Sequence, residues 1–304
     1  MLPELNVNPE VITALQRGDP VVALESTLIT HGFPAPENIE VAWAIEQAVR
    51  DQGAVPATIA VLAGQITVGL TPDQLDYLGS AQRVRKCSRR DLPLVIACKQ
   101  DGATTVAGTM IVAHWAGIRV FATGGIGGVH RGHPFDESAD LMELARTPIV
   151  VVCAGAKAIL DLPLTLEVLE TQGVPVIGFQ TDELPAFYSR QSGLPVDLRV
   201  DNPEELVSLI RINDKLGLGM GLLITVPVPI EEEWPAKEAQ VVINQALADA
   251  EAENITGKAI TPYLLSRVND LSGERSKKAN IALLLNNARV AGQIAKALSG
   301  YGDP

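Results

Sequence analysis

Aromatic side chains are scarce in this sequence, since Phe, Trp and Tyr together make up 4% of its 304 residues. Hydrophobic residues nevertheless account for 47% of the chain, so its core must consist mainly of Ala, Val, Leu and Ile. No Ser/Gly-rich linker, low-complexity segment or internal repeat divides the sequence. A chain of this length can bury one large core, and we therefore expect a single domain over residues 1–304.

Cysteine is also rare. Its three positions, Cys87, Cys98 and Cys153, are odd in number and contain no C-x-x-C pair, which argues against a disulfide scaffold and against a zinc knuckle. No stretch reaches the roughly 18 unbroken apolar residues of a membrane span, and the N-terminal segment lacks the apolar centre of a signal peptide. We therefore expect a cytoplasmic protein that does not associate with membranes.

Positive charge is in short supply, with 24 Lys and Arg against 36 Asp and Glu, a net charge of −12 and a pI near 4.8. Such a protein repels a polyanionic duplex, so a nucleic-acid polymer is not an expected partner. A small phosphorylated substrate remains possible, because a few lysines and backbone amides act on it at short range.

Apolar segments and segments with helical spacing alternate along the chain. The segments that predict strands are 20–26, 55–64, 118–125, 147–157, 175–180 and 221–229. Helices are predicted from a cap at Asn8, over 38–53 and 104–116, over 136–146, and over most of the chain beyond 230. Such β-α-β units predict an α/β fold with a parallel or mixed sheet covered on both faces, and ligands at the carboxyl ends of its strands.

A glycine-rich stretch, ATGGIGGVHRG, follows one predicted strand at residues 122–132. Glycine amides can approach an anion closely, which favours a phosphate-binding loop, although a tight turn would use the same residues. The stretch matches neither a dinucleotide fingerprint nor a nucleotide P-loop.

Acidic residues follow this glycine-rich stretch. Asp136 and Asp140 are four apart, so on a helix they would project from one face, and with Ser138 they offer the oxygen ligands that Mg²⁺ or Mn²⁺ prefers. Acidic residues also simply favour a helix N-terminus, and the sequence leaves both interpretations open.

Two ionisable residues end strongly apolar strands. Lys157 would be a nucleophilic amine if it pointed into a desolvated pocket, and a solvated lysine if it opened the next helix. Glu25 could similarly be a proton donor or a polar strand end that faces water. Lys86 could contact a phosphate or lie in a solvated basic turn, and Asn280 could bind the edge of a base or simply begin a helix.

Ten ordered blocks strengthen these interpretations: ALEST, HGFPAPEN, QGAVPATIA, KCSRRDLP, GATTVAGTM, FATGGIGGVHRG, FDESADL, VVCAGAK, GVPVIGFQT and LPAFYSR. Together they resemble the pseudouridine-5′-phosphate glycosidase family, also called indigoidine synthase A-like. The resemblance covers almost the whole chain. It implies a three-layer α/β/α fold with a mixed, mostly parallel central sheet, a homotrimer, and one Mn²⁺ in each subunit.

The same resemblance assigns roles to individual residues. Lys157 matches the family's nucleophile, Glu25 its proton donor and Asp136 its metal ligand. The implied substrate contacts are Lys86, Val106, Thr123, His130, Ser138, Ala139, Asp140 and Asn280, of which Asn280 would contact uracil and Thr123 and His130 the phosphate region.

The implied activity is reversible cleavage of pseudouridine 5′-phosphate to uracil and ribose 5-phosphate through a lysine Schiff base. It would make the protein a C-glycosidase of the pseudouridylate synthase type, in the carbon–oxygen lyase class. Two alternatives would share some of these residues: a Schiff-base phosphosugar aldolase or lyase, and a non-catalytic sugar-phosphate-binding protein.

Overall fold

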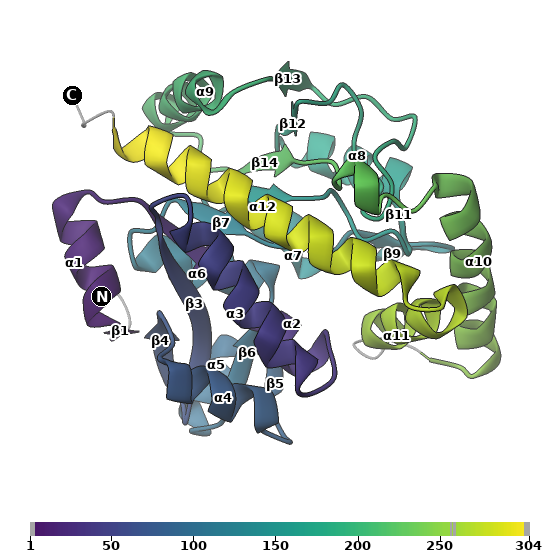
Figure 1. Cartoon of the computed structure of the whole chain (residues 1–304), viewed down its shortest axis with the longest axis horizontal. Helices are drawn as coiled ribbons and strands as arrows, with labels where there is room; N and C mark the ends of the chain where they lie inside the picture. The colour runs from purple at the N-terminus through teal and green to yellow at the C-terminus, as the bar shows by residue number, and fades with distance from the viewer. Residues whose placement is uncertain (1–3, 256, 258–259, 301–304) are drawn as a thin grey trace.

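The computed structural model describes residues 4–255, 257 and 260–300, and its main feature is a twisted central sheet (Figure 1). Eleven strands of the described chain form this sheet in the order β1-β4-β3-β2-β7-β10-β14-β12-β13, with β6 on β3 and β5 on β6. Their bounds are β1 (Asn6–Val7), β2 (Val21–Leu24), β3 (Val55–Leu62), β4 (Gln65–Val68), β5 (Arg85–Cys87), β6 (Gly102–Thr104), β7 (Val120–Ala122), β10 (Val150–Cys153), β12 (Val176–Phe179), β13 (Leu198–Val200) and β14 (Leu222–Thr225). A smaller sheet contains β8 (Val129–His130), β9 (His133–Glu137) and β11 (Leu160–Asp161).

The long sheet is mostly parallel, as the sequence predicts. Strands β3, β2, β7, β10, β14, β12 and β13 pair in parallel, whereas β4 and β6 run antiparallel to β3. Every residue of β2, β10, β12 and β14 is buried, because helices cover both faces of the sheet.

One face is crossed by the last helix of the described chain, α12 (Arg275–Ser299), which packs on β2, β7 and β10 beside α3 (Glu37–Arg50) and α9 (Pro203–Leu216) (Figure 1). The other face is covered by α6 (Val106–Trp115), which contacts β3, β2 and β7 and is backed by α7 (Ala139–Leu144). The remaining helices are α1 (Pro9–Arg17), α2 (Thr27–His31), α4 (Pro72–Ser80), α5 (Leu92–Ala97), α8 (Leu162–Thr171), η1 (Ile230–Glu232), α10 (Ala236–Ala252) and α11 (Ile260–Ser272).

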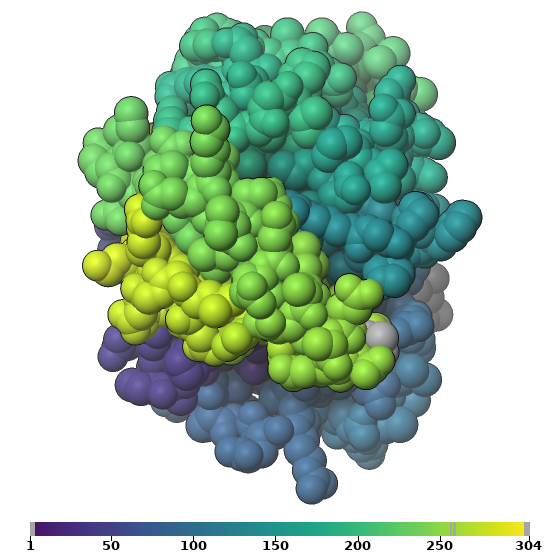
Figure 2. All heavy atoms as spheres, turned by 90° about the vertical axis from the view of Figure 1, so that its right-hand side faces the viewer, coloured from purple at the N-terminus to yellow at the C-terminus, as the bar shows by residue number. Residues whose placement is uncertain are grey.

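The helix pair α10 and α11 packs together at one side of the molecule, which faces the viewer in Figure 2. None of the helices among the described residues is long and apolar enough to cross a bilayer.

Local signals in the sequence place several elements correctly. The side chain of Asn8 accepts a hydrogen bond from the Glu10 amide at the start of α1, and Gly18 ends that helix in the left-handed conformation. Thr71 and Gln74 form a reciprocal capping box at the start of α4. These helix ends depend on neighbours in the sequence, so they can be predicted without knowledge of the fold.

The helix predicted over residues 136–146 is wrong in its first part. Residues His133–Glu137 form β9, which pairs with β8, and Ser138 caps α7, which begins only at Ala139. Asp136 and Asp140 therefore lie on different elements and do not share a helix face. The pairing partner β8 lies across a turn, and strand pairing there outweighs the helical spacing of the acidic residues.

A buried carboxyl group joins α3 to the sheet. It lies away from the carboxyl ends of the strands, where the sequence predicts the functional site. Glu46 of α3 is 6% exposed, and its Oε1 accepts a hydrogen bond of 2.5 Å from the Thr58 hydroxyl of β3. Burial raises the pKa of Glu46 above its usual value of 4.5, while the Thr58 hydrogen bond and the Arg50 charge oppose that rise. Folding therefore favours the protonated form of this side chain.

Replacing Glu46 with Gln should stabilise the protein at neutral pH. Ionisation of Glu46 costs nothing below pH 4.5, and its cost grows as the pH rises from 4.5 towards the raised folded-state pKa. Gln cannot ionise and still offers Thr58 an acceptor, so we expect the melting temperature of Glu46→Gln to rise by roughly 2 °C at pH 7.5 and to be unchanged at pH 4. Exposed Glu40 on the same helix supplies the control, Glu40→Gln, and an equal gain at both pH values would contradict the explanation.

Candidate active site

Glu25 and Thr123 are neighbours because β2 and β7 pair in parallel. Leu24 and Ala122 are in register, so the residue after each strand emerges at the same edge of the sheet. The Thr123 hydroxyl donates a hydrogen bond to Oε1 of Glu25, and the Thr27 hydroxyl lies 2.6 Å from its Oε2. Glu25 is half-buried and has no ion-pair partner among the described residues. Its carboxyl group is therefore held by hydroxyl groups alone.

Lys157 reaches the same edge from the next strand, β10, whose Val152 is in register with Ala122. Its backbone N–H donates to the Ile126 carbonyl at 3.1 Å, and the Ile126 N–H donates to Gly155 at the same distance. The Lys157 side chain is half-buried, and within the described part of the chain its amine has no hydrogen-bond or ion-pair partner. The amine is available to a ligand.

Cys153, the last residue of β10, is fully buried close to this segment. Burial raises the pKa of its thiol to about 12, and two backbone hydrogen bonds and the positive charge of Lys157 oppose part of that rise.

The glycine-rich loop, residues 123–128, runs along the end of β10. A Cβ atom on Gly127 would lie 2.2 Å from the Ser138 hydroxyl, so only glycine fits there. The amides of Ile126, Gly127 and Val129 already donate to groups of the protein. Those of Gly124, Gly125 and Gly128 donate to no other described residue, and they are the amides that remain for an anion.

Asp140 holds this loop in place. Its carboxylate, 6% exposed, accepts hydrogen bonds from the amides of Gly127 (2.8 Å) and Ala107 (2.9 Å), and so joins the loop to the start of α6. Ser138 is half-buried and caps α7, with Ala139 exposed beside it, while Val106 is buried at the first position of α6. The predicted substrate contacts Val106 and Ser138–Asp140 thus lie together at this junction.

Asp136 and His130 face each other across the β8–β9 hairpin. The Asp136 carboxylate lies 3.2 Å from Nδ1 of His130, and its side chain is 48% exposed. Nε2 of His130 is buried without a hydrogen-bond partner among the described residues. A ligand that enters from the glycine-rich loop could satisfy this nitrogen.

A metal ion at Asp136 would have few protein ligands, because no group of three or more His, Cys, Asp or Glu side chains in the described structure could hold one. Asp140 already accepts one amide hydrogen bond at each carboxylate oxygen. A half-exposed carboxylate nevertheless fits Mn²⁺ or Mg²⁺, which commonly keep several water ligands and bind one or two carboxylates together with a substrate phosphate.

The remaining predicted contacts come from two other elements. Lys86 is half-buried on β5, close to His31 at the end of α2, whose pKa is lowered by burial and, to a lesser extent, by the Lys86 charge. Asn280 is half-buried on α12, seven residues before Asn287 and so on the same helix face. Fully buried Asn287 donates to the carbonyls of Thr123 (2.8 Å) and Gly124 (3.3 Å), so this face of α12 lies on the glycine-rich loop.

Sequence reasoning misses three residues that shape the site. Thr27 contacts Glu25, Asn287 holds the glycine-rich loop, and the Arg131 guanidinium donates to the Ala158 (2.8 Å) and Leu160 carbonyls (3.0 Å) just after Lys157. Thr27 and Arg131 lie within the ordered blocks ALEST and FATGGIGGVHRG, so the sequence carries a signal for both. Asn287 lies outside these blocks and acts through a contact that only the folded chain creates.

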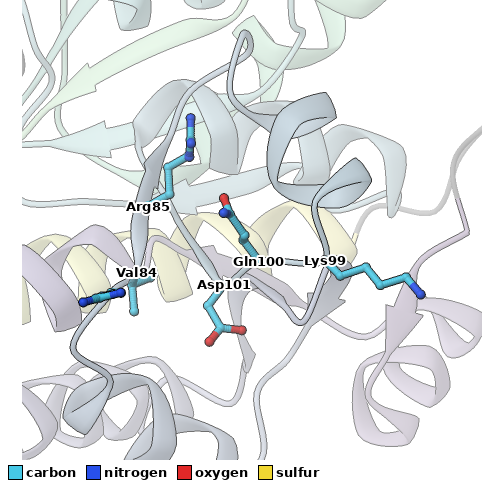
Figure 3. Close-up of a pocket in the computed structure, with 6 residues that line it drawn as sticks. Val84, Arg85, Lys99, Gln100 and Asp101 are labelled. Carbon is cyan, nitrogen blue, oxygen red and sulfur yellow. The ribbon is translucent and has the colours of Figure 1, made fainter.

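A hollow on the surface lies elsewhere (Figure 3). Its lining residues are Arg83, Val84, Arg85, Lys99, Gln100 and Asp101. Asp101 is held there by the Tyr77 hydroxyl at 2.6 Å, and the Lys99 side chain points away from the other labelled residues in Figure 3. No predicted site residue lines this hollow, so it is not the candidate active site.

The comparisons with known proteins agree with one another. A family model described as indigoidine synthase A like protein matches residues 10–297. A pseudouridine-5′-phosphate glycosidase from Methylobacterium nodulans is 59% identical, with 98% of this chain and 89% of that protein aligned. Another, from Geobacillus kaustophilus, is 58% identical, with 95% and 97% aligned.

Solved structures show the same similarity. The prealnumycin C-glycosynthase AlnA, crystallised in complex with ribulose 5-phosphate, matches with a TM-score of 0.91 and 42% identity over 98% of both chains. An indigoidine synthase A-like protein from Thermotoga maritima matches with a TM-score of 0.89 and 35% identity, over 97% of this chain and 96% of that one.

Proposed function

The chain belongs to the indigoidine synthase A-like family, and we propose that it is a pseudouridine-5′-phosphate glycosidase that reversibly cleaves its substrate to uracil and ribose 5-phosphate. The observation that carries this proposal is the meeting of Glu25, Thr123 and the Lys157 segment at the carboxyl edge of β2, β7 and β10. Relatives with this name, and a relative crystallised with a sugar phosphate, support it. A phosphosugar aldolase and a non-catalytic binding protein find no such support.

The substrate dictates the chemistry. A C-glycoside has no oxygen or nitrogen leaving group, so the paired-carboxylate mechanism of ordinary glycosidases would release an unstable uracil carbanion. In our proposal the Lys157 amine attacks the anomeric carbon, the ring C–O bond breaks, and the amine proton passes to the ring oxygen. The sugar is then open and attached to the enzyme through nitrogen.

Cleavage of the carbon–carbon bond follows from this open form. Glu25 gives its proton to the uracil carbon, the bonding electron pair restores the double bond of the uracil ring, and the lone pair of Lys157 nitrogen forms an iminium ion. Water then hydrolyses the imine and releases ribose 5-phosphate. We assign the reaction to the carbon–oxygen lyase class because the ring C–O bond opens first.

The other residues bind and orient the substrate. We propose that the amides of the glycine-rich loop, with His130 and Lys86, hold the phosphate, that Thr123 holds Glu25 at the start of that loop, and that Asn280 contacts the edge of uracil. Val106 and Ser138–Asp140 would shape the remaining wall. Asp136 would hold one Mn²⁺, which supplies positive charge near the phosphate.

We also propose that the protein assembles as a homotrimer in the cytoplasm, a reducing compartment that suits the cysteine pattern. Phe135 on β9 is 99% exposed, and every other residue of that strand is exposed as well. A large aromatic side chain left in water favours burial against a second copy of the chain, by about 2 kcal/mol. The resemblance supplies the number of subunits.

Lys157 should form a covalent adduct with ribose 5-phosphate. Borohydride should reduce the imine, and mass spectrometry should place the added mass on the peptide that contains Lys157. Lys157→Ala should abolish the adduct and reduce uracil release by roughly 10⁴-fold or more. Lys215→Ala, at an exposed position on α9, is the control that should retain both. Uracil release by Lys157→Ala at a near-native rate would disprove the mechanism.

Asp136→Ala should weaken Mn²⁺ binding, measured by titration calorimetry and by the electron paramagnetic resonance signal of free Mn²⁺. Glu137→Ala changes the next residue of the exposed strand β9 and should bind the metal normally. Uracil release should fall in Asp136→Ala alone. Equal Mn²⁺ affinity in both variants would contradict the assignment.

Light scattering should give a mass of about three times 32.3 kDa at micromolar concentration. Phe135→Ser should shift the population towards smaller species, because it removes the apolar contact. A monomer mass for the wild-type protein would be evidence against the proposed assembly.

A further inference from the structure

The Thr27 hydroxyl group has one hydrogen and two close acceptors. Its oxygen lies 2.6 Å from Oε2 of Glu25 and 2.7 Å from the carbonyl oxygen of Thr104. A carbonyl oxygen can only accept a hydrogen bond, and so can an ionised carboxylate. If Glu25 is ionised, one of the two contacts therefore joins two oxygen atoms without a hydrogen between them.

A proton on Oε2 of Glu25 removes this conflict. Oε2 then donates to Thr27, Thr27 donates to the Thr104 carbonyl, and the Thr123 hydroxyl donates to the other carboxyl oxygen, Oε1. Every hydrogen in this series of hydrogen bonds then has one acceptor. The arrangement is therefore complementary to the acid form of Glu25, the form that gives a proton away.

The Thr104 carbonyl, which accepts the last of these hydrogen bonds, is held in place by its surroundings. Thr104 is fully buried, its amide donates to the Ser26 hydroxyl at 2.9 Å, and its own hydroxyl donates to the Ile59 carbonyl at 2.7 Å. The Thr109 hydroxyl donates to the Thr104 hydroxyl at 2.9 Å. Neutral groups of β3, of α6 and of the residue before α2 thus hold Thr104, and Thr27 itself is 8% exposed.

We propose that Thr27 is a positioning residue that places the transferable proton on Oε2 of Glu25 and compensates for its loss. This inference rests on the proposed function. Before transfer, Thr27 accepts from Glu25 and donates to Thr104. As the proton moves to the uracil carbon, Glu25 becomes a carboxylate, and rotation of the Thr27 hydroxyl turns its hydrogen from Thr104 to Oε2. The new carboxylate then accepts hydrogen bonds from Thr27 and Thr123, while the contact between the Thr27 oxygen and the Thr104 carbonyl loses its hydrogen.

The charged groups on neighbouring elements do not replace this role. They include His31 on α2 and Lys157 after β10, and the ion pairs of the described residues include none between these side chains and Glu25. Thr27 and Thr123 are thus the side chains that hydrogen-bond Glu25 in this part of the structure. Thr123 contacts Oε1, which leaves Oε2 to Thr27.

The test compares Thr27→Val, which keeps the shape and loses the hydroxyl, with Thr27→Ser, which restores the hydroxyl. For Thr27→Val we expect the kcat of uracil release to fall between about 10- and 100-fold, with KM unchanged within about threefold. Its solvent deuterium isotope effect on kcat should increase, because proton transfer to carbon becomes rate-limiting. Borohydride trapping of ribose 5-phosphate on Lys157 should stay native, since imine formation from the sugar does not need Glu25. Thr27→Ser should recover most of the lost rate.

Thr109→Val is the matched control, because Thr109 belongs to the same buried hydroxyl network and does not touch Glu25. It should keep a native isotope effect; the same increase there would assign the defect to the network and overturn the proposal. Thr27→Ala gives the same test if the Val variant does not fold. A native kcat in the hydroxyl-free variant, with an active wild-type enzyme, would overturn this inference alone. A wild-type enzyme that releases no uracil would overturn the proposed function and this inference with it.

Discussion

The parallel register of β2, β7 and β10 is the constraint on which the candidate site depends. Leu24, Ala122 and Val152 lie side by side, so whatever follows each strand emerges at one edge of the sheet. Glu25 and Thr123 follow directly, and the Lys157 segment is tied to the glycine-rich loop by a pair of backbone hydrogen bonds. A shift of one residue in either pairing would turn alternate side chains to the other face and separate acid from nucleophile.

Polar side chains that bind backbone groups hold this edge rigid. Asp140 joins the glycine-rich loop to α6, and Asn287 joins the same loop to α12 from the opposite face of the sheet. Arg131 binds the carbonyls that follow Lys157. Each uses a buried or half-buried polar side chain to hydrogen-bond backbone groups of the loops at this edge. These hydrogen bonds therefore hold the glycine-rich loop in place beside the residues that we propose for catalysis.

The acidic segment after the glycine-rich loop illustrates a limit of sequence patterns. Asp136 and Asp140 have helical spacing, yet Asp136 lies on an exposed hairpin strand and Asp140 is a buried structural group. The two residues are spaced as on a helix, but the chain turns at Arg131 and Gly132, and His133–Glu137 pairs with β8 as a strand. Two carboxylates that look like one ligand pair in the sequence thus act separately in the structure.

The sequence by itself determined the family, the α/β class with its mostly parallel sheet, several helix ends, and the residue types expected for the chemistry. These features depend on periodicity, on capping residues near in the chain and on long ordered blocks. The tertiary structure alone decided that Thr27 sits between Glu25 and Thr104, that Asn287 of α12 meets Thr123, and that Asp140 is already bonded at both oxygens. Such contacts join residues far apart in the chain, and no local pattern encodes which polar groups burial will bring within hydrogen-bonding distance.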